Sequence, residues 1–279
     1  MGEPDEGERE KGVRRVFTEE TAGFEGLYSS SYGTTNDATR GVLARVDEWS
    51  SRILDLGLAA LLLLLVTPLM ALVAIAIKID SPGPLFFRCR RVGFRGRAFD
   101  MLKFRKMRDG VGGPALTARA DPRFTRVGGF LAKTKLDEVP QLWNVLRGEM
   151  SLVGPRPEDP SFVAIEPEAY SKILGVRPGI TGLSQLAFAR ETEILDPADG
   201  VTHYVRTLLP QKVRLDCLYV SRRSLRMNLG ILFWTAVAVL LRQDVAVNRV
   251  TARLGFRRRP SKQAAAPELG EVIGAEAQQ

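Results

Sequence analysis

One uncharged stretch limits what this chain can fold into more than any other feature of its sequence. It runs LGLAALLLLLVTPLMALVAIAI from Leu56 to Ile77, and none of its twenty-two residues carries a charge. About 20 consecutive apolar residues are enough for a helix to cross the hydrocarbon core of a bilayer. The stretch therefore predicts a membrane-embedded helix, with the rest of the folded chain outside the hydrocarbon.

Pro68 lies near the middle of this stretch and leaves its topology open. Proline removes one helical hydrogen bond, and its ring clashes with the carbonyl four residues earlier. The hydroxyl of Thr67 could satisfy a freed carbonyl. One interpretation is a spanning helix with a proline kink; the other is a re-entrant helix–break–helix that enters and leaves by the same leaflet. Basic residues flank both ends, so the positive-inside rule does not place the flanks on opposite sides.

A second apolar stretch, LGILFWTAVAVLL, covers the thirteen residues from Leu229 to Leu241 and is too short to span. The basic sequence SRRSLRMN precedes it. This combination predicts an interfacial amphipathic helix with Trp234 near the lipid headgroups. An ordinary buried core helix is the alternative.

Composition divides the chain into parts. Residues 1–45 are polar and rich in Gly, Ser and Thr, which predicts a disordered N-terminal tail, too polar and acidic for a signal peptide. Residues 46–80 hold the membrane segment, and residues 81–250 are predicted to form the folded domain. Residues 255–279 are predicted to be a flexible C-terminal tail.

The scarcity of cysteine and histidine argues against several classes of site. Cys89 and Cys217 do not make a disulfide framework or a zinc site. A single histidine, His203, argues against a histidine metal site or a Ser-His-Asp triad. Any bound metal would therefore have oxygen ligands, which favours Mg²⁺.

Positive charge is concentrated in one region. From Arg88 to Lys135 the chain has fourteen Lys or Arg residues and three Asp, whereas the whole chain has a net charge of +8. Such a concentration indicates an anionic partner. The sequence VGGPALTARADPRFTRVGG in this region suits phosphate groups, and a basic face attracted to anionic lipid is the alternative.

Glycine and proline mark three turns in the folded domain. Leu85–Phe87 and Ala98–Phe104 predict two short strands of a hairpin around the turn Gly93–Gly96. Further on, the sequences VGPRP and VRPGITG are rigid turns that hold Arg156 and Arg177. An arginine held in this way loses little entropy when it binds a phosphate or a carboxylate.

The sequence LDEVP places two adjacent carboxylates, Asp137 and Glu138, at a predicted helix start, where proline is tolerated. Asp137 could simply be the N-cap, accepting backbone N–H groups. A carboxylate at this position, beside Lys133 and Lys135, is also kept ionised and could act as a nucleophile or a Mg²⁺ ligand. Successive helical residues point about 100° apart, so the two carboxylates should have different roles.

Taken in order, these motifs resemble those of the bacterial sugar transferase family, the monotopic polyprenyl-phosphate phosphoglycosyl transferases. The resemblance covers about residues 50–245. The matching sequences are Arg52-x-x-Asp55, Pro68, IKIDSPGPLFF, RVGFRG, KFRKM, DPRFTRVG, KLDEVPQLWNVLRGEMSLVGPRP, RPGITGLSQ and LDCLYV. Longer relatives carry an N-terminal multi-helix membrane region, which is not found here, so the chain resembles the short form.

This resemblance implies an enzyme that transfers a sugar 1-phosphate from a nucleotide diphosphate sugar, usually a UDP-sugar. The acceptor would be a polyprenyl phosphate such as undecaprenyl phosphate, and UMP would be released. It implies that Asp137 is the nucleophile, forms a covalent phosphosugar–aspartyl intermediate and is a ligand of Mg²⁺, with Glu138 as the second member of the dyad. The residues expected to bind phosphate or substrate are Lys103, Arg105, Arg126, Lys133, Arg156 and Arg177.

The resemblance also implies a fold class and a location. We expect an α+β, mostly helical fold: a membrane-embedded re-entrant helix, broken at Thr67 and Pro68, with a small cytoplasmic catalytic domain and interfacial amphipathic helices. The location would be the bacterial inner (plasma) membrane, with the catalytic domain on the cytoplasmic side, where nucleotide sugars are. The reaction would be the first membrane step of exopolysaccharide or other glycoconjugate synthesis, followed by further glycosyltransferases.

The chain departs from the family pattern beside the expected nucleophile. Ala132 stands where an arginine is common, and Lys135 where a serine is frequent; Lys133 or Lys135 is expected to substitute for the arginine. After Gln185 the sequence LAFARETEILDPADG is particular to this chain and is where we expect selectivity for the sugar.

A membrane-anchored binding or scaffold protein is the competing hypothesis. A basic face that docks on lipid or nucleic acid would need neither Asp137 nor Glu138, so activity that survives their loss would favour it. We do not expect a nucleic acid partner, because the chain has no recognisable binding motif and no regular aromatic platform.

Overall fold

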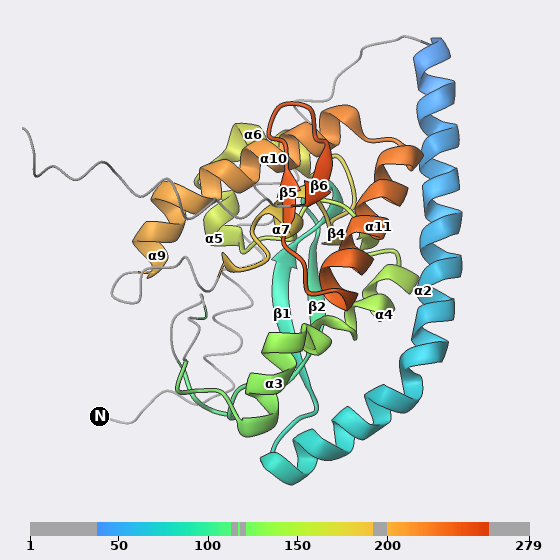
Figure 1. The fold of residues 1–279 in the computed structure, drawn as a ribbon. Helices are drawn as coiled ribbons and strands as arrows, with labels where there is room; N and C mark the ends of the chain where they lie inside the picture. Colours follow the sequence, from blue (N-terminus) through green and yellow to red (C-terminus); the bar gives the residue numbers. More distant parts are fainter. Residues whose placement is uncertain (1–37, 113–116, 118–120, 192–199, 257–279) are drawn as a thin grey trace, which may run out of the picture.

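Figure 1 shows the computed structural model of the chain, which describes residues 38–112, 117, 121–191 and 200–256. This described part is mostly helical with three small two-stranded sheets, so the expected α+β class is confirmed. The predicted tails fall largely outside it. Helix α2 already begins at Ala38, however, inside the segment that was expected to be an N-terminal tail.

Helix α2 (Ala38–Asp80) is one helix of 43 residues that contains the uncharged stretch, with side chains described from residue 48. It bends in its C-terminal half, which contains Pro68, and the other elements lie on its concave side (Figure 1). The hydroxyl of Thr67 donates to the carbonyl of Leu63 at 2.6 Å, whereas the carbonyl that proline leaves without a donor is that of Leu64. The helix is therefore bent rather than broken, in contrast to the predicted helix–break–helix.

Most of the apolar part of α2 faces away from the rest of the chain. Glu48–Asp80 is long and apolar enough to cross a membrane, and only 11% of its most apolar window is buried. Leu64, Leu72 and Ile79 are 73%, 65% and 82% exposed. A core helix of a soluble protein would hide such side chains, so their exposure indicates membrane association.

The predicted hairpin is confirmed, although its first strand begins at Phe86 and continues to Val92 instead of covering only Leu85–Phe87. Strand β1 (Phe86–Val92) pairs antiparallel with β2 (Ala98–Phe104) around the short turn Phe94–Gly96. Side chains alternate along a strand, so Lys103 lies on the same face of β2 as the buried Met101. This alternation directs a lysine toward the interior of the domain.

The remaining helices follow the hairpin. They are α3 (Arg126–Thr134), the 3₁₀ turn η2 (Leu136–Glu138), α4 (Gln141–Leu146), α5 (Pro160–Val163), α6 (Pro167–Ile173), α7 (Leu183–Ala187), α9 (Gly200–His203), the π-helix η3 (Tyr204–Leu208), α10 (Leu209–Arg222) and α11 (Leu225–Leu240). Buried side chains from the hairpin, α4, α6, α7 and α10 form one hydrophobic core.

Two further strand pairs complete the fold. Strand β3 (Ser151–Val153) pairs parallel with β4 (Gly179–Thr181), and the connection between them passes through α5 and α6. Strand β5 (Val245–Val247) pairs antiparallel with β6 (Leu254–Phe256) after α11. Directly after β3, Gly154 and Pro155 fold back against Gly179 at the start of β4, so the VGPRP turn lies on the VRPGITG sequence.

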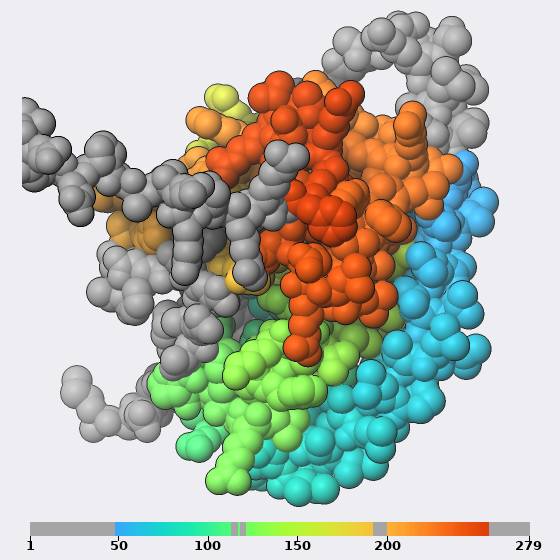
Figure 2. Space-filling view, viewed as in Figure 1, coloured from blue at the N-terminus to red at the C-terminus, as the bar shows by residue number. Residues whose placement is uncertain are grey.

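Helix α11 contains the second apolar stretch. Ile231 is buried against the core, whereas Phe233 and Leu240 are 62% and 79% exposed. The ring of Trp234 packs edge-on against that of Phe256 at 5.0 Å. Figure 2 shows the surface of α11 and the β5–β6 pair beside that of α2 on one face of the molecule. A fully buried core helix is therefore excluded, but the helix is not amphipathic as predicted, because its exposed side is apolar too.

Two side chains of α2 fasten it to the rest of the chain. The guanidinium of Arg52 donates to the carbonyl of Val145 at 2.8 Å. The buried carboxylate of Asp55 accepts hydrogen bonds from the Ser151 hydroxyl at 2.7 Å and from the Leu152 N–H at 3.0 Å. The Arg52-x-x-Asp55 sequence therefore ties the membrane helix to the end of α4 and the start of β3.

We expect Asp55→Asn to lower the free energy of unfolding by about 1.5–3 kcal/mol, because a charged acceptor of two hydrogen bonds becomes an amide. The measurement is unfolding of the chain in nanodiscs, followed by tryptophan fluorescence. Glu48→Gln is the matched control: its carboxylate is on the same helix and 46% exposed, and its loss should cost less than about 1 kcal/mol. Equal losses in both variants would contradict the docking role of Asp55.

Candidate active site

The two adjacent carboxylates lie on the short turn that joins α3 to α4. Lys135 ends α3 with a φ of 60°, in the left-handed region, and the 3₁₀ turn η2 follows directly. Three residues complete one 3₁₀ turn, so Asp137 and Glu138 point about 120° apart. The capping positions before η2 and before α4 are Lys135 and Pro140. The N-cap interpretation of Asp137 is therefore wrong.

The carboxylate of Asp137 is almost completely buried and is paired with one lysine. Only 2% of the residue is exposed, and Nζ of Lys106 lies 3.2 Å from its Oδ2. The Lys106 ammonium also lies over the ring of Phe124, 5.8 Å from its centroid. Sequence reasoning missed Lys106: it is part of the KFRKM sequence, but nothing in that linear pattern shows where its side chain points.

Glu138 is held by two cations. Its Oε1 accepts from Nζ of Lys103 at 3.0 Å and from Nη2 of Arg156 at 2.8 Å. Burial alone would raise the pKa of Glu138, but the charges of Arg156 and Lys103 and the hydrogen bond from Arg156 hold the pKa well below its usual range. The charge of Glu138 in turn raises the pKa of Arg156. Glu138 is therefore ionised, and both cations contact the same oxygen.

Close backbone packing positions Arg156. The N–H of Gly179 donates to the carbonyl of Pro155 at 2.8 Å, and the N–H of Gly154 donates to that of Thr181 at 2.9 Å. A Cβ atom on Gly179 would overlap the backbone of Gly154, so glycine is required for this approach. The VGPRP turn therefore rests on the VRPGITG turn, and this contact directs Arg156 toward the carboxylate pair.

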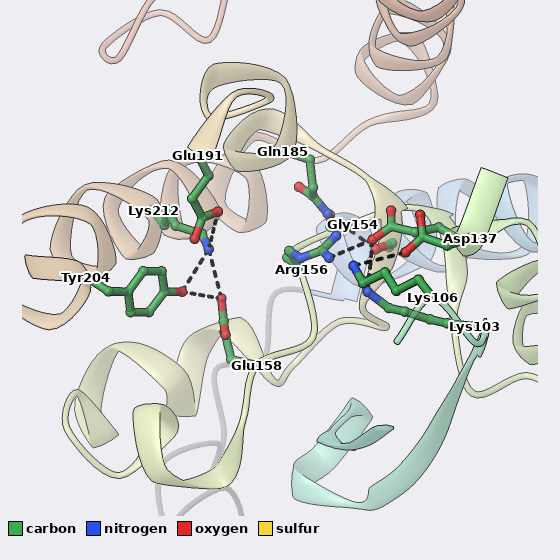
Figure 3. A network of polar contacts seen from close by, with 12 residues as sticks. Lys103, Lys106, Asp137, Gly154, Arg156, Glu158, Gln185, Glu191, Tyr204 and Lys212 are labelled. Atoms are coloured by element: carbon green, nitrogen blue, oxygen red, sulfur yellow. Dashed lines mark hydrogen bonds and ion pairs between the residues drawn. The ribbon is translucent and has the colours of Figure 1, made fainter. Parts of the chain in front are cut away.

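Three cations surround two carboxylates at this site. Figure 3 shows Lys103, Lys106 and Arg156 converging around Asp137. The side chain of Lys103 is 13% exposed, and burial together with repulsion by Arg156 and Lys106 lowers its pKa in spite of the attraction of Glu138. The excess of positive charge gives the site the electrostatic character that phosphorylated ligands need.

The structure places two of the predicted phosphate-binding arginines elsewhere. Arg105 is buried, and its guanidinium donates to the carbonyl oxygens of Pro82 and, at 2.7 Å, of Ser81, in the loop after α2. Nε of Arg177 donates to the carbonyl of Gly148 at 3.1 Å. Both guanidinium groups bind backbone carbonyls, and Arg177 also pairs with Glu48 at 3.8 Å, so phosphate binding by them stays a prediction.

Two other predicted binding residues lie on the surface of α3. Arg126 begins this helix and lines an open hollow of about 680 Å³ together with Asp80, Arg108 and Asp109. Lys133 is exposed in the last turn of the same helix. Within the described residues neither forms an ion pair with the carboxylate pair, so phosphate binding by them stays a prediction.

The site offers carboxylate oxygens as ligands for Mg²⁺, but the described residues do not form a complete set of protein ligands. No group of three or more Asp, Glu, His or Cys side chains with metal-binding spacing is found in the part of the chain that the structure describes. Glu138 accepts from Lys103 and Arg156 through Oε1, and Asp137 is paired with Lys106 through Oδ2. Asp137 as the protein ligand of Mg²⁺ stays a prediction. Mg²⁺ is usually held by one or two carboxylates together with substrate phosphates and waters, so the residues present fit an ion that binds with a diphosphate.

Comparison with known families identifies one that the chain matches. Residues 46–242 match the family model described as bacterial sugar transferase. This match covers well over half of the chain, so the chain belongs to the bacterial sugar transferase family. The expected enzyme class, a phosphoglycosyl transferase, is confirmed.

Curated relatives carry names from the same class. A UDP-glucose:undecaprenyl-phosphate glucose-1-phosphate transferase of Caulobacter vibrioides is 42% identical over 72% of this chain and 73% of its own length. The exopolysaccharide production protein PSS of Rhizobium leguminosarum bv. phaseoli is 39% identical over 64% of this chain and 90% of its own. A UDP-N-acetylgalactosamine-undecaprenyl-phosphate N-acetylgalactosaminephosphotransferase of Aeromonas hydrophila is 36% identical over 67% of this chain and 43% of its own length. The chain spans less than half the length of several other curated relatives that it matches.

We expect Glu138→Gln to lower the free energy of unfolding by about 3–5 kcal/mol near neutral pH, because it leaves Lys103 and Arg156 buried without their shared anion. The folded-state pKa of Glu138 is lowered, so its stabilisation is present above the unfolded value of about 4.3 and is lost as the pH falls toward the folded value. The difference in the free energy of unfolding between the parent and the variant should therefore become smaller in acid. Unfolding curves from about pH 7 to pH 3 would measure it.

Asp100→Asn is the control for this variant. Asp100 pairs with Arg90 at 3.3 Å, but both side chains are more than 40% exposed, so its loss should cost less than about 1 kcal/mol. A difference between parent and Glu138→Gln that stays constant with pH would refute the ionised role of Glu138.

Proposed function

We propose that the chain transfers a sugar 1-phosphate from a UDP-sugar to undecaprenyl phosphate and releases UMP. The observation that carries this proposal is the buried Asp137, beside Glu138 and surrounded by Lys103, Lys106 and Arg156, in a chain of the bacterial sugar transferase family. The names of the Caulobacter and Aeromonas relatives support the donor and acceptor classes. The reaction would be the first membrane step in the synthesis of an exopolysaccharide or another glycoconjugate.

Asp137 is the proposed nucleophile. One of its carboxylate oxygens attacks the phosphorus that bears the sugar, and the bond from this phosphorus to the bridging oxygen breaks, so that UMP leaves with the electron pair. A phosphosugar–aspartyl intermediate results. An oxygen of undecaprenyl phosphate then attacks the same phosphorus, the bond to Asp137 breaks, and the free carboxylate is restored as the undecaprenyl diphosphate sugar leaves.

The cations around Asp137 have separate tasks. Lys106 is 3.2 Å from the nucleophile and holds its carboxylate in place before the attack. Lys103 and Arg156 are held by Glu138, so their positions are set before a substrate binds. Charges that are already in place need no reorganisation when charge develops on the transferred phosphate. Mg²⁺, bound by Asp137 and the diphosphate, would neutralise charge and polarise the phosphate oxygens.

The acceptor determines where the site must lie. A polyprenyl phosphate presents its phosphate at the membrane surface, and nucleotide sugars are in the cytoplasm. We therefore propose that α2 enters and leaves by the cytoplasmic leaflet of the inner membrane, with its bend in the half that contains Pro68. The exposed apolar side of α11, next to α2, would then lie at the same interface (Figure 2).

We expect Asp137→Asn to reduce UMP release by at least about 10³-fold, because an amide cannot be the nucleophile. The chain in nanodiscs would be incubated with Mg²⁺, undecaprenyl phosphate and a panel of UDP-sugars. Asp100→Asn is the matched control, since its exposed carboxylate lies outside the site and the variant should keep full activity. Asp137→Asn that transfers sugar phosphate at the parent rate would defeat the mechanism and favour a membrane-anchored scaffold.

The same panel identifies the sugar. The relatives are named for different sugars, glucose and N-acetylgalactosamine, so the family alone does not select one. The sequence expected to govern selectivity, LAFARETEILDPADG, includes residues 192–199, which lie outside the described residues. UMP release with one sugar of the panel would name the donor.

We expect both ends of α2 to be on the cytoplasmic side. In a variant with Cys89 and Cys217 replaced by serine, single cysteines would be introduced at Glu48 and at Asp109, one on either side of the membrane segment. A membrane-impermeant maleimide should label neither cysteine in intact spheroplasts and both after permeabilisation. Labelling of only one of the two in intact spheroplasts would show a spanning helix instead.

A further inference from the structure

A second buried group of charges lies behind Arg156, on the side away from the carboxylate pair (Figure 3). It consists of Glu158, Glu191, Tyr204 and Lys212, and the proposed chemistry does not use it. Nζ of Lys212 donates to Glu158 at 3.1 Å, to the Tyr204 hydroxyl at 2.8 Å and to Glu191 at 3.3 Å. The hydroxyl of Tyr204 donates to Glu158 at 2.7 Å. The side chain of Lys212 is only 5% exposed.

These residues belong to separate elements. Glu158 follows the VGPRP turn, two positions after Arg156, whereas Tyr204 begins η3 and Lys212 lies on α10. Glu191 lies beyond the end of α7. One ammonium group therefore connects the turn that carries Arg156 to three other parts of the domain.

Glu158 and Lys212 are both ionised. Burial alone would raise the pKa of Glu158, but the charges of Lys212 and Arg91, with smaller contributions that include Arg156, lower the pKa instead. Burial alone would lower the pKa of Lys212, but the charges of Glu158 and Glu191 raise it. A buried pair of this kind contributes little to stability compared with apolar side chains of the same size, so its position beside the active site calls for another explanation.

Arg156 lies between two carboxylates. It donates to Glu138 at 2.8 Å, and the charge of Glu158, followed by the smaller contribution of Glu191, also attracts it. The other cation that acts on Glu158 from β1, Arg91, is itself held by Asp159 at 2.6 Å. Lys212 is therefore the group that keeps Glu158 compensated without the help of Arg156.

We propose that Lys212 is a positioning residue of the active site: by neutralising Glu158, it leaves Arg156 bound to Glu138. The inference rests on the proposed function, in which Arg156 must stay beside the dyad. Lys212 itself does not touch Asp137 or Glu138 and acts only through the competition between two carboxylates for one guanidinium.

Lys212→Met tests this competition because methionine keeps an extended side chain but removes the charge. Glu158 then loses its main counter-charge, and its pKa rises toward or above the usual value of about 4.3. As the pH increases through that raised value, Glu158 ionises and attracts Arg156 away from Glu138. The other groups that act on Glu158 or belong to its cluster are Arg91, Arg156, Tyr170, Glu191, Tyr204 and Asp216, of which only the two arginines are cations.

We expect the ratio of UMP release by Lys212→Met to that by the parent chain to fall, by about tenfold to a hundredfold, as the pH increases from the usual glutamate value of about 4.3 upward. Lys212→Arg keeps the charge and should follow the parent profile. Lys212→Met with Glu158→Gln removes the competing carboxylate together with its partner. The double variant should release UMP at a rate within about threefold of the parent rate. The ratio of the two rates should not change with pH.

The outcomes separate positioning from structural support. Rates are normalised to folded protein, measured by unfolding in nanodiscs. Folded Lys212→Met with the parent pH profile would overturn the inference, and so would a folded double variant that stays inactive. A folded but inactive double variant would overturn the inference even if Lys212→Met alone does not fold. If the parent chain releases no UMP from any donor, the proposed function fails first, which the parent measurement alone reveals.

Discussion

The docking of α2 through Arg52 and Asp55 is the contact on which the rest of the arrangement depends. One turn of the membrane helix presents a guanidinium to the carbonyl oxygens of Val145 and Met150 and a carboxylate to the start of β3. The segment that receives these bonds begins after the dyad turn and continues into the VGPRP turn. The apolar helix is therefore fixed relative to both sides of the candidate site.

Charge compensation explains how so many ionised groups are tolerated in the interior. Lys103, Glu138 and Arg156 alternate in sign, and beyond Arg156 the order continues with Glu158 and Lys212. Removing a charge from water costs several kcal/mol per ion, which is offset only when each neighbour has the opposite sign. The same alternation makes the position of Arg156 sensitive to charges that never reach the substrate.

Sequence reasoning succeeded where neighbours in the chain decide the outcome. The ends of β2 follow from strand alternation and a glycine turn, and the helical turn that holds Asp137 follows from the LDEVP pattern. It did not distinguish Arg156 from Arg177, since both stand in similar Pro-Gly turns. In the folded chain the two turns pack against each other, so Arg156 meets the dyad while Arg177 binds a backbone carbonyl.

The sequence by itself determined the membrane helix, the hairpin, the carboxylate pair and the basic region around it, because each depends on residues that are close together in the chain. Only the tertiary structure decided which cation meets which carboxylate. The Arg156–Glu138 and Lys212–Glu158 pairs join residues 18 and 54 positions apart. Such pairs form only after packing has excluded water and set the direction of every side chain, and no linear pattern carries that information.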